Sequence, residues 1–336
     1  SVAAARLVGA GHRVVGATLR LWGGESDSGC CSAADADDAR RVAQVLGIDH
    51  HVFNYAEEFE REVVAPYVAA HREGLTPNPC VACNRAIKFD HLLARARRLG
   101  FDALATGHHA RVVWRAGRAT LARATDPAKD QSYVLGHLGA EALARLVLPV
   151  GTSTKAAVRA EARELGLRTW DKPESQDACF APTRTRAAFL ASRLALTPAR
   201  VVDADGTELG RVDAAELVTV GQRRGIARGR DGAARYVTRI DVAARRVDVA
   251  TDGGAATTHV ALAPGTLSLR EPALGPARVR AQWSAHGAAR AAELVTDGPA
   301  RLILDEPARP AAPGQSVVLY RDDDPRLVLG AALVGR

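Results

Sequence analysis

The order of the expected elements in residues 1–182 constrains the fold more than any other feature, because strands and helices alternate there. Helices are expected at 2–10, 32–46, 56–73 and 84–99, and strands at 13–19, 51–54 and 102–106. This alternation is typical of a parallel sheet with helices on both faces. Ligands of such sheets bind beyond the carboxyl ends of the strands, so the loops at 22–32 and 106–109 are candidate binding loops.

The remainder of the chain is rich in short strands. Asp-Gly and other Gly-rich turns separate strand-like runs at 200–202, 208–212, 217–220, 235–240 and 246–250. The same pattern continues from residue 264 to residue 334, which favours two small β-rich domains divided near residue 260. We therefore predict three domains, at 1–182, 183–260 and 261–336.

Composition excludes two classes of protein and leaves two explanations open for the positive charge. With 47% hydrophobic and 25% charged residues the chain is not disordered, and it has no apolar run of the ~20 residues that a membrane span needs. The net charge is +7, and the segment 183–260 is the most basic, with 13 basic and 9 acidic residues. Its stretch Gly221–Arg230 holds four arginines, which suits phosphate contacts or an ordinary solvated loop.

The first residues indicate a missing start. The sequence begins on Ser1, contains no methionine and opens as if a helix were already under way. It has no basic segment followed by an apolar one, so it is not a signal peptide. Five cysteines in so long a chain favour a reducing compartment over a disulfide scaffold, and we expect a cytoplasmic protein.

The densest motif is Thr76–Phe89, which contains Cys80 and Cys83. We expect Cys83 near a helix start, where the helix dipole and nearby Arg85 or Lys88 stabilise a thiolate. Alone, a Cys-x-x-Cys pair fits half of a zinc site, a redox pair or a nucleophile with a neighbour. A four-cysteine zinc site would need the vicinal pair at 30–31, whose geometry is poor.

Three further segments can carry chemistry. Cys179 lies in a polar loop and is either an ordinary thiol or the partner of Cys83 in sulfur transfer. The loop 106–109 follows a strand, where its histidines are structural unless a phosphate binds there. The segment Asp126–Tyr133 combines Lys, Asp and Gln side chains and suits contacts to phosphate and a base edge.

Together these segments resemble the tRNA-uridine 2-sulfurtransferase family, also called tRNA-specific 2-thiouridylases. The matching pieces are Gly-His-Arg-Val-Val-Gly (11–16), Gly-Cys-Cys-Ser (29–32), Thr-Pro-Asn-Pro-Cys-Val-Ala-Cys-Asn (76–84), Ile-Lys-Phe (87–89), Ala-Thr-Gly-His-His (105–109), Lys-Asp-Gln-Ser-Tyr (129–133), Pro-Val-Gly (149–151), Ser-Gln-Asp-Ala-Cys-Phe (175–180), Val-Gly-Gln-Arg-Arg-Gly (220–225) and Pro-Gly-Gln (313–315). They follow one another in the family's order along essentially the whole chain.

The resemblance implies a fold and a reaction. The fold would be an adenine-nucleotide α-hydrolase-like, Rossmann-like catalytic domain, followed by a β-rich central tRNA-binding domain and a C-terminal β-barrel. ATP, with Mg²⁺, would adenylate the wobble uridine in the tRNA anticodon loop, and a persulfide loaded by a sulfur-relay donor protein would supply sulfur. The enzyme would act as a monomer.

The resemblance also implies roles for individual residues. Cys83 matches the nucleophile, and Cys179 matches the persulfide carrier and redox partner of Cys83. Matches to ATP contacts are Ser1, Leu19 and Gly107; those to the target base are Asn78, Pro79 and Cys80. Matches to tRNA-binding positions are His108, Lys129, Asp130, Gln131, Arg223, Arg224, Arg280 and Gln315.

The chain departs from the family in three places. Some members have Asp where this chain has Cys80, which is then an acid/base substitute or a third thiol for an iron–sulfur cluster. Ser1 matches the last residue of a Ser-Gly-Gly-x-Asp-Ser-Ser phosphate loop, so we expect the first strand and this loop to be missing and this form to be inactive in adenylation. An Arg-Tyr-Arg-like tRNA contact is replaced by Arg280-Ala-Gln282.

Two other functions remain open from the sequence. One is a different adenylating enzyme that thiolates uridine at position 4 or cytidine. The other is a non-catalytic RNA-binding protein whose cysteines hold a metal or an iron–sulfur cluster.

Overall fold

The computed structural model describes residues 1–21, 33–172, 178–181, 185–229, 231–270 and 276–336. They fall into two compact units, each of which is described by itself. Unit 1 consists of residues 1–64, 80–184 and 326–328, and unit 2 of residues 65–79, 185–325 and 329–336.

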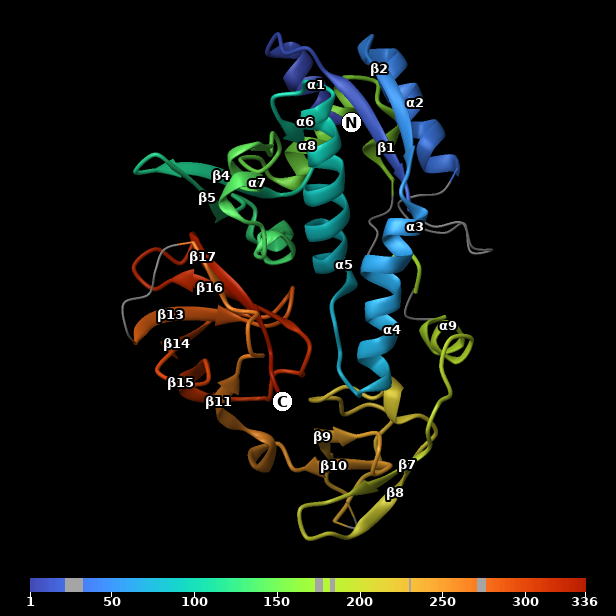
Figure 1. The fold of residues 1–336 in the computed structure, drawn as a ribbon, viewed down its shortest axis with the longest axis vertical. Helices are drawn as coiled ribbons and strands as arrows, with labels where there is room; N and C mark the ends of the chain where they lie inside the picture. Colours follow the sequence, from blue (N-terminus) through green and yellow to red (C-terminus); the bar gives the residue numbers. More distant parts are fainter. Residues whose placement is uncertain (22–32, 173–177, 182–184, 230, 271–275) are drawn as a thin grey trace. The chain divides into compact units, whose positions relative to one another are not determined.

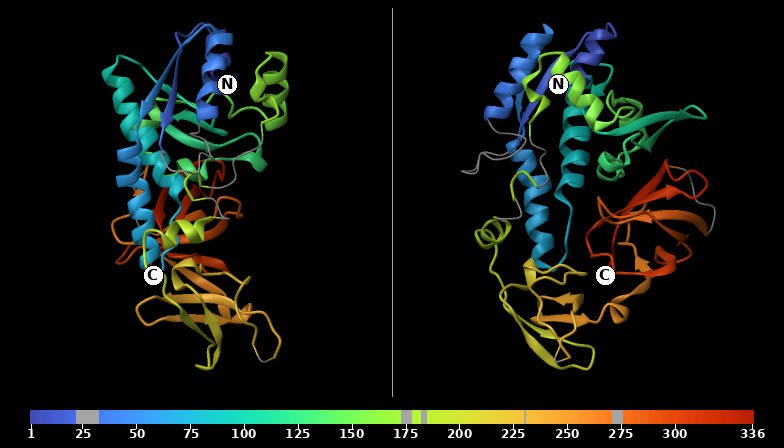
Figure 2. Two further views of the ribbon diagram at one scale, coloured as in Figure 1. Left: turned by 90° about the vertical axis from the view of Figure 1, so that its right-hand side faces the viewer. Right: turned by 180° about the vertical axis from the view of Figure 1, so that it is seen from behind.

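Unit 1 begins with the expected alternation of helix and strand. The elements are α1 (Val2–Gly9), β1 (Val15–Arg20), α2 (Ala33–Leu46) and β2 (Asp49–Asn54). Strands β1 and β2 are parallel, and helix α2 packs against both of them (Figures 1 and 2). The prediction of parallel strands joined by helices is therefore confirmed for this region.

A small apolar core lies beneath these helices. Helix α8 (Lys155–Glu164) is capped by Thr154, whose hydroxyl oxygen accepts the Ala157 amide proton at 3.2 Å. It packs on α1, and both contribute side chains to one buried cluster. The cluster consists of Val2, Ala3, Val42, Val150, Ala162 and Leu167.

Two longer helical stretches contain π-helical segments. The first runs through α3 (Ala56–Phe59), π-helix η1 (Glu60–Val64) and α4 (Ala65–Arg72); the second through α5 (Pro79–Ala82), π-helix η2 (Cys83–Leu92) and α6 (Leu93–Arg98). The second stretch begins at Pro79, earlier than the predicted residue 84, because proline fits the first helical position, where no amide donor is needed. Within the described ranges, no helix is long and apolar enough to cross a membrane.

The rest of unit 1 contains short strands and turns. Strands β3 (Leu104–Ala105) and β6 (Leu146–Val147) are parallel, and the strand predicted at 102–106 thus has only two residues. Strands β4 (Ala110–Arg115) and β5 (Arg118–Arg123) form a hairpin that was not predicted. The remaining elements are η3 (Pro127–Lys129), η4 (Tyr133–Leu135), α7 (Ala140–Ala144) and η5 (Arg168–Trp170).

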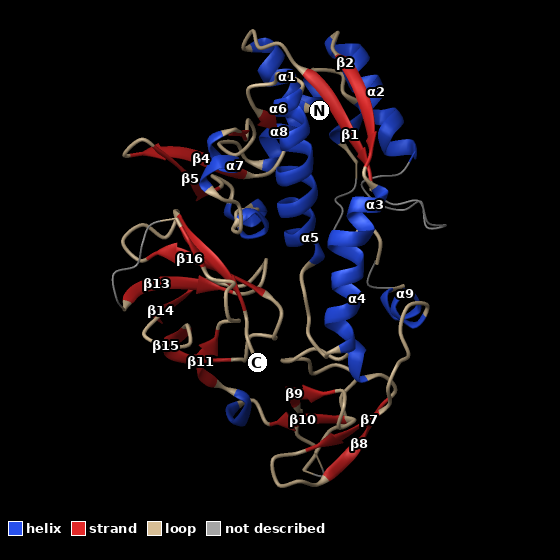
Figure 3. Cartoon of the chain, in the orientation of Figure 1, coloured by secondary structure: helices blue, strands red, loops and turns tan. Residues whose placement is uncertain are grey.

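After α9 (Arg186–Ala191), unit 2 is built from strands, as predicted (Figure 3). Its first sheet has the order β8-β7-β10-β9, formed by β7 (Ala199–Val202), β8 (Glu208–Val212), β9 (Tyr236–Asp241) and β10 (Arg246–Ala250). The prediction of a strand at 217–220 is wrong, because η6 (Ala215–Leu217) is followed by a turn there. The fully buried Val201, Val237 and Val247 lie in the core of this sheet.

The last sheet has seven strands in the order β11-β15-β14-β13-β16-β17-β12. Their bounds are β11 (Thr257–Ala261), β12 (Ser268–Leu269), β13 (Ala277–Gln282), β14 (Arg290–Val295), β15 (Arg301–Ala308), β16 (Ser316–Arg321) and β17 (Val328–Leu333). One face is fully buried at Val279, Leu294, Leu302 and Leu319. Strand β11 crosses the boundary predicted at residue 260.

Candidate functional site

The helix that carries the cysteine motif gives its two thiols different surroundings. Pro79 is the first residue of α5, so Cys80 lies in the first helical turn and is exposed. Cys83 is buried and begins the π-helix η2. Cys83 therefore lies near the helix start, as expected, one turn after Pro79. π-Helices are rare and are found frequently at functional sites, and Cys83 is the first residue of this one.

The segment that carries Cys179 is anchored by its neighbour. Phe180 is almost fully buried and meets the ring of Phe59 edge-on, with 5.5 Å between the ring centroids. Phe59 ends α3, and both α3 and η1 pack against η2. This aromatic contact therefore holds the segment of half-buried Cys179 against helices that pack on η2, the element that starts with Cys83.

The residue after Cys83 offers a buried hydrogen-bond acceptor. Asn84 is 3% exposed, and within the described part of the chain its Oδ1 atom accepts no hydrogen bond. Burying such an atom without a donor costs about 1–3 kcal/mol, so a bound molecule that supplies one gains affinity. Asn84 belongs to the cysteine motif, but the sequence alone did not indicate that its side-chain oxygen would have no hydrogen-bond donor.

His108 lies in the predicted binding loop that follows β3. Its Nδ1 atom shares a hydrogen bond of 2.9 Å with the Thr106 hydroxyl. The centroid of its ring lies 6.2 Å from the ring centroid of Phe89. Burial lowers the pKa of His108 to about 3, and the nearby Lys88 and His109 add to the shift. The imidazole is therefore neutral near pH 7 and contributes a hydrogen bond rather than a positive charge.

The low pKa of His108 predicts a pH dependence of stability. An imidazole in an unfolded chain has a pKa of about 6.5. Below that pH, His108 therefore binds a proton in the unfolded state but not in the folded state. The free energy of unfolding should thus fall from about pH 6.5 to about pH 4 more steeply in the wild type than in His108→Gln. Urea titrations across this range measure the two slopes, and parallel curves throughout would contradict the prediction.

The predicted tRNA-contact segment 129–131 is held to this loop. The His109 amide donates to Gln131 Oε1 at 2.8 Å, and the Gln131 amide donates to the His109 carbonyl at 2.7 Å. The structure therefore brings together two segments that the sequence suggested separately. Lys129 ends η3, which is capped by the carboxylate of Asp126.

Asp130 is engaged within the protein. Its Oδ2 atom accepts from Arg123 Nη1 and from the Ser132 hydroxyl, both at 2.8 Å. Its Oδ1 atom accepts the Ala124 amide proton at 2.9 Å. The carboxylate thus holds the loop in shape, and this role explains why the loop can present its neighbours at fixed positions.

The three predicted ATP contacts all lie in unit 1. Ser1 precedes the first residue of α1, and its Oγ accepts the Thr169 hydroxyl proton at 2.9 Å. Leu19 is paired with Phe53 across the β1–β2 ladder. Gly107 is exposed, and among the described residues beyond its two chain neighbours no atom lies within 4 Å of the position that a Cβ would occupy, so this space can take a ligand.

The predicted tRNA-contact residues of unit 2 lie in three places, two of which are the turn 219–225 and strand β13. In the turn 219–225, the side chain of Gln222 accepts the Thr219 amide proton at 3.0 Å and donates to the Arg224 carbonyl at 2.8 Å. Arg223 and Arg224 consequently project into solvent. Arg280, on β13, forms an ion pair with Asp322 at 3.4 Å.

Gln315 precedes β16 in the last sheet of unit 2. Its amide donates to the Ala312 carbonyl at 3.0 Å, and its carbonyl accepts the Val334 amide proton at 2.8 Å. Its backbone is therefore fixed at both groups.

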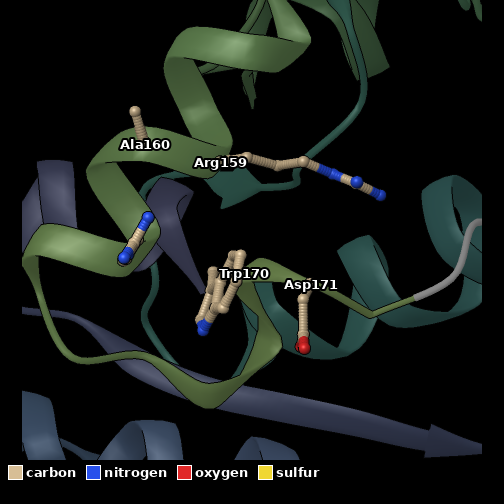
Figure 4. A pocket seen from close by; sticks show the side chains of 5 residues that line it. Arg159, Ala160, Trp170 and Asp171 are labelled. Atoms are coloured by element: carbon tan, nitrogen blue, oxygen red, sulfur yellow. The ribbon is translucent and has the colours of Figure 1, made fainter.

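One pocket of unit 1 lies among none of these residues. It has a volume of about 250 Å³ and is formed by α8, the end of η5 and the residue that follows it (Figure 4). The lining side chains are Arg159, Ala160, Arg163, Trp170 and Asp171. Because it contains no thiol and no predicted contact residue, we do not assign the reaction to it.

A metal or cluster site does not emerge from the described side chains. Within residues 1–21, 33–172, 178–181, 185–229, 231–270 and 276–336, no three His, Cys, Asp or Glu side chains are grouped as metal ligands. Cys80, Cys83 and Cys179 therefore do not form a three-thiol set for an iron–sulfur cluster in this structure. Cys30 and Cys31 lie outside the described residues.

Known sequence families match nearly the whole chain. Residues 1–183 match a family described as a tRNA methyl transferase HUP domain, and residues 187–251 match its PRC-barrel domain. Residues 268–334 match an aminomethyltransferase beta-barrel domain. These matches confirm the predicted fold class, with an adenine-nucleotide type of α/β domain followed by two β domains. A HUP domain also implies the use of ATP.

Curated relatives match over the same length. The chain is 46% identical to the tRNA-specific 2-thiouridylase MnmA of Mycolicibacterium smegmatis, over 100% of this chain and 96% of the relative. It is 44% identical to the protein of the same name from Acidothermus cellulolyticus, over 100% of this chain and 94% of the relative. This coverage gives no support to the truncation predicted at Ser1.

The family models cover most of the chain, and the relatives are 44–46% identical over its full length. The chain belongs to the tRNA-specific 2-thiouridylase family.

Proposed function

We propose that this chain catalyses the ATP-dependent 2-thiolation of the wobble uridine of tRNA, with Cys83 as the nucleophile and Cys179 as the persulfide carrier. The observation that supports this most is the anchoring of Cys179 through Phe180 to the helices around Cys83. Sulfur transfer between two residues needs both to be held in one place.

The first step would activate the base. The C2 oxygen of uridine attacks the α-phosphate of ATP, pyrophosphate leaves, and the oxygen becomes part of an AMP leaving group. Ser1 at the start of α1, Leu19 and the open backbone at Gly107 are the proposed nucleotide contacts. Mg²⁺ would arrive on the triphosphate, since no group of three metal-ligating side chains lies in the described part of the chain.

The second step would transfer sulfur. The donor protein leaves a persulfide on Cys179, and the Cys83 thiolate attacks its inner sulfur. This forms a Cys83–Cys179 disulfide and releases hydrosulfide, which attacks C2 and expels AMP. In the other order, the terminal sulfur attacks C2 first and Cys83 then cleaves the sulfur–sulfur bond. Both orders end in the same disulfide, which an external dithiol must reduce before the next turnover.

The remaining site residues would position the tRNA. Asn78, Pro79 and Cys80 would contact the target base, and neutral His108 would donate or accept a hydrogen bond beside it. The proposed RNA contacts further away are Lys129, Gln131, Arg223, Arg224, Arg280 and Gln315, with Asp130 supporting the loop. Exposed arginines such as Arg223 and Arg224 suit the phosphate backbone.

A single turnover tests this assignment. Protein loaded with persulfide, unmodified tRNA and ATP are mixed without reductant, and the disulfides are mapped by peptide analysis. We expect a Cys83–Cys179 disulfide in proportion to the 2-thiouridine formed. Cys80→Ser serves as the matched control, since it removes a neighbouring thiol and should leave the ratio of that disulfide to 2-thiouridine unchanged. Thiolation without a new disulfide would refute the mechanism.

Gly107→Ala should weaken ATP binding specifically. A methyl group at this position meets no atom of the described residues beyond its chain neighbours, so the fold tolerates it, but it fills the open space above the backbone. We expect the KM for ATP to rise roughly 10-fold, equivalent to about 1.4 kcal/mol, with the KM for tRNA unchanged. Gly139→Ala is the control, because its Cβ also meets open space and it lies outside the proposed site. An unchanged KM for ATP in Gly107→Ala would remove Gly107 from the nucleotide site.

A non-catalytic RNA-binding protein with a cysteine-bound metal is the second candidate. It predicts stoichiometric zinc or iron in the purified protein and no thiolation. The thiolation assay with metal analysis separates the two. The three-domain division at residues 182 and 260, the monomeric state, the persulfide donor and the cytoplasmic location remain predictions of the proposed function.

A further inference from the structure

The β4–β5 hairpin of unit 1 has a composition that the proposed reaction does not use. Residues 110–124 contain four arginines and no acidic residue. Near the turn, Trp114 is 63% exposed, more than any other large apolar side chain in the described ranges. Figures 1 and 2 show the turn of this hairpin projecting from the rest of unit 1.

The turn of the hairpin fixes two arginines directly opposite each other. Ala116 and Gly117 both have positive φ, at 45° and 74°, which is the backbone of a tight two-residue turn. Arg115 and Arg118 are therefore paired across the strands, while Trp114 is paired with Ala119. Across the described ranges, neither guanidinium has an ion-pair partner. Like charges directly opposite each other on a hairpin reduce its stability.

The base of the hairpin is held firmly. Ala122 forms a β-bridge with Leu327, and the Arg123 amide donates to the Arg326 carbonyl at 2.7 Å, all within unit 1. Arg111 donates through Nε to the Arg123 carbonyl at 2.8 Å. The two opposed charges and the exposed indole are thus presented by a rigid element.

We infer that the tip of the β4–β5 hairpin is an RNA-binding surface, where Trp114 stacks on an unpaired base of the tRNA and Arg115 and Arg118 bind its phosphates. A base has a flat face for the indole, and guanidinium groups match phosphate oxygens in fork geometry. A polyanion also removes the repulsion between the two arginines. The inference relies on the proposed function only in taking tRNA as the substrate, and it adds a contact outside the cysteine site.

The test measures equilibrium binding of unmodified tRNA to the full chain by filter binding, without ATP or persulfide. We expect Trp114→Ala and the double variant Arg115→Ala/Arg118→Ala each to raise Kd roughly 10-fold at low salt. Loss of two phosphate contacts should also reduce the slope of log Kd against log salt by about 1.5. Trp114→Phe should restore most of the affinity, because it keeps a stacking ring.

Controls separate this surface from general charge and from folding. Arg13→Ala/Arg98→Ala removes the same charge from two other exposed arginines of unit 1 and should change Kd less than about 2-fold. The melting temperature of Arg115→Ala/Arg118→Ala should be unchanged or higher, since repulsion is relieved, whereas a structural role would lower it. At saturating tRNA, kcat should match the wild type.

Several results would overturn the inference. One is a Kd and a salt slope in the hairpin variants equal to those of the Arg13/Arg98 control. Another is loss of binding to vesicles of anionic phospholipid while tRNA binding is unchanged, which would assign the hairpin to a membrane surface. Failure of the wild type itself to bind tRNA would contradict the proposed function as well, so the two failures are distinguishable.

Discussion

Cys83→Ser is expected to lower the single-turnover rate of 2-thiouridine formation by at least about 10³-fold, because a serine hydroxyl is not ionised near neutral pH and attacks a persulfide poorly. Cys179→Ser should have an equally large effect, since it removes the atom that carries the sulfur. The double variant should be no slower than either single one, because the two thiols act in one sequence of steps. Rapid-quench assays with tRNA analysed for 2-thiouridine measure these rates.

The same variants separate the two halves of the reaction. Adenylation precedes sulfur transfer and does not use a thiol, so both variants should still release pyrophosphate when tRNA and ATP are present. Cys80→Ser is the matched substitution in the exposed first turn of the same helix, and its rate measures the contribution of that thiol. Full activity in Cys83→Ser or in Cys179→Ser would rule out the proposed mechanism.

Gly151→Ala is expected to lower the free energy of unfolding by at least about 3 kcal/mol, because the added Cβ has no room. That atom would lie 1.7 Å from the carbonyl oxygen and 2.6 Å from the carbonyl carbon of Ala110. Both are backbone atoms, so no side-chain rotation relieves the overlap. The strand would have to shift, and with it His109, the residue that bonds to Gln131.

Urea denaturation followed by circular dichroism measures this loss. Gly107→Ala is a suitable control for stability, since its Cβ would meet no atom within 4 Å. We expect its midpoint to stay within experimental error of the wild type. A Gly151→Ala protein with the wild-type midpoint would show that the two backbones can separate at little cost.

The elements with strong local patterns could be predicted from the sequence. Helix α2 and strands β1, β2, β8 and β10 lie within a few residues of where the sequence predicts them, although β1, expected to be a buried strand, is only half-buried to exposed. The prediction missed the β4–β5 hairpin, because its turn has an uncommon sequence. The Arg-Ala-Gly-Arg turn of the β4–β5 hairpin lacks the usual Asn-Gly or Asp-Gly signal, although Gly117 does adopt the positive φ that such a turn needs.

Only part of the candidate site could be predicted from the sequence. The residue types in the motifs identified the thiols, but not their surroundings, which depend on contacts between segments far apart in the chain. The link from Phe180 to Phe59, the bonds that occupy Asp130 and the isolated acceptor on Asn84 arise only when these segments pack. No pattern in a single sequence reports such pairings.

The paired backbone hydrogen bonds between His109 and Gln131 have a consequence for the order of binding. They join a loop assigned to the nucleotide and the base with a loop assigned to the tRNA. A ligand that shifts one loop toward its bound position therefore shifts the other with it. Thermodynamic linkage makes the benefit mutual, so tRNA and ATP should each increase the affinity for the other by the same factor.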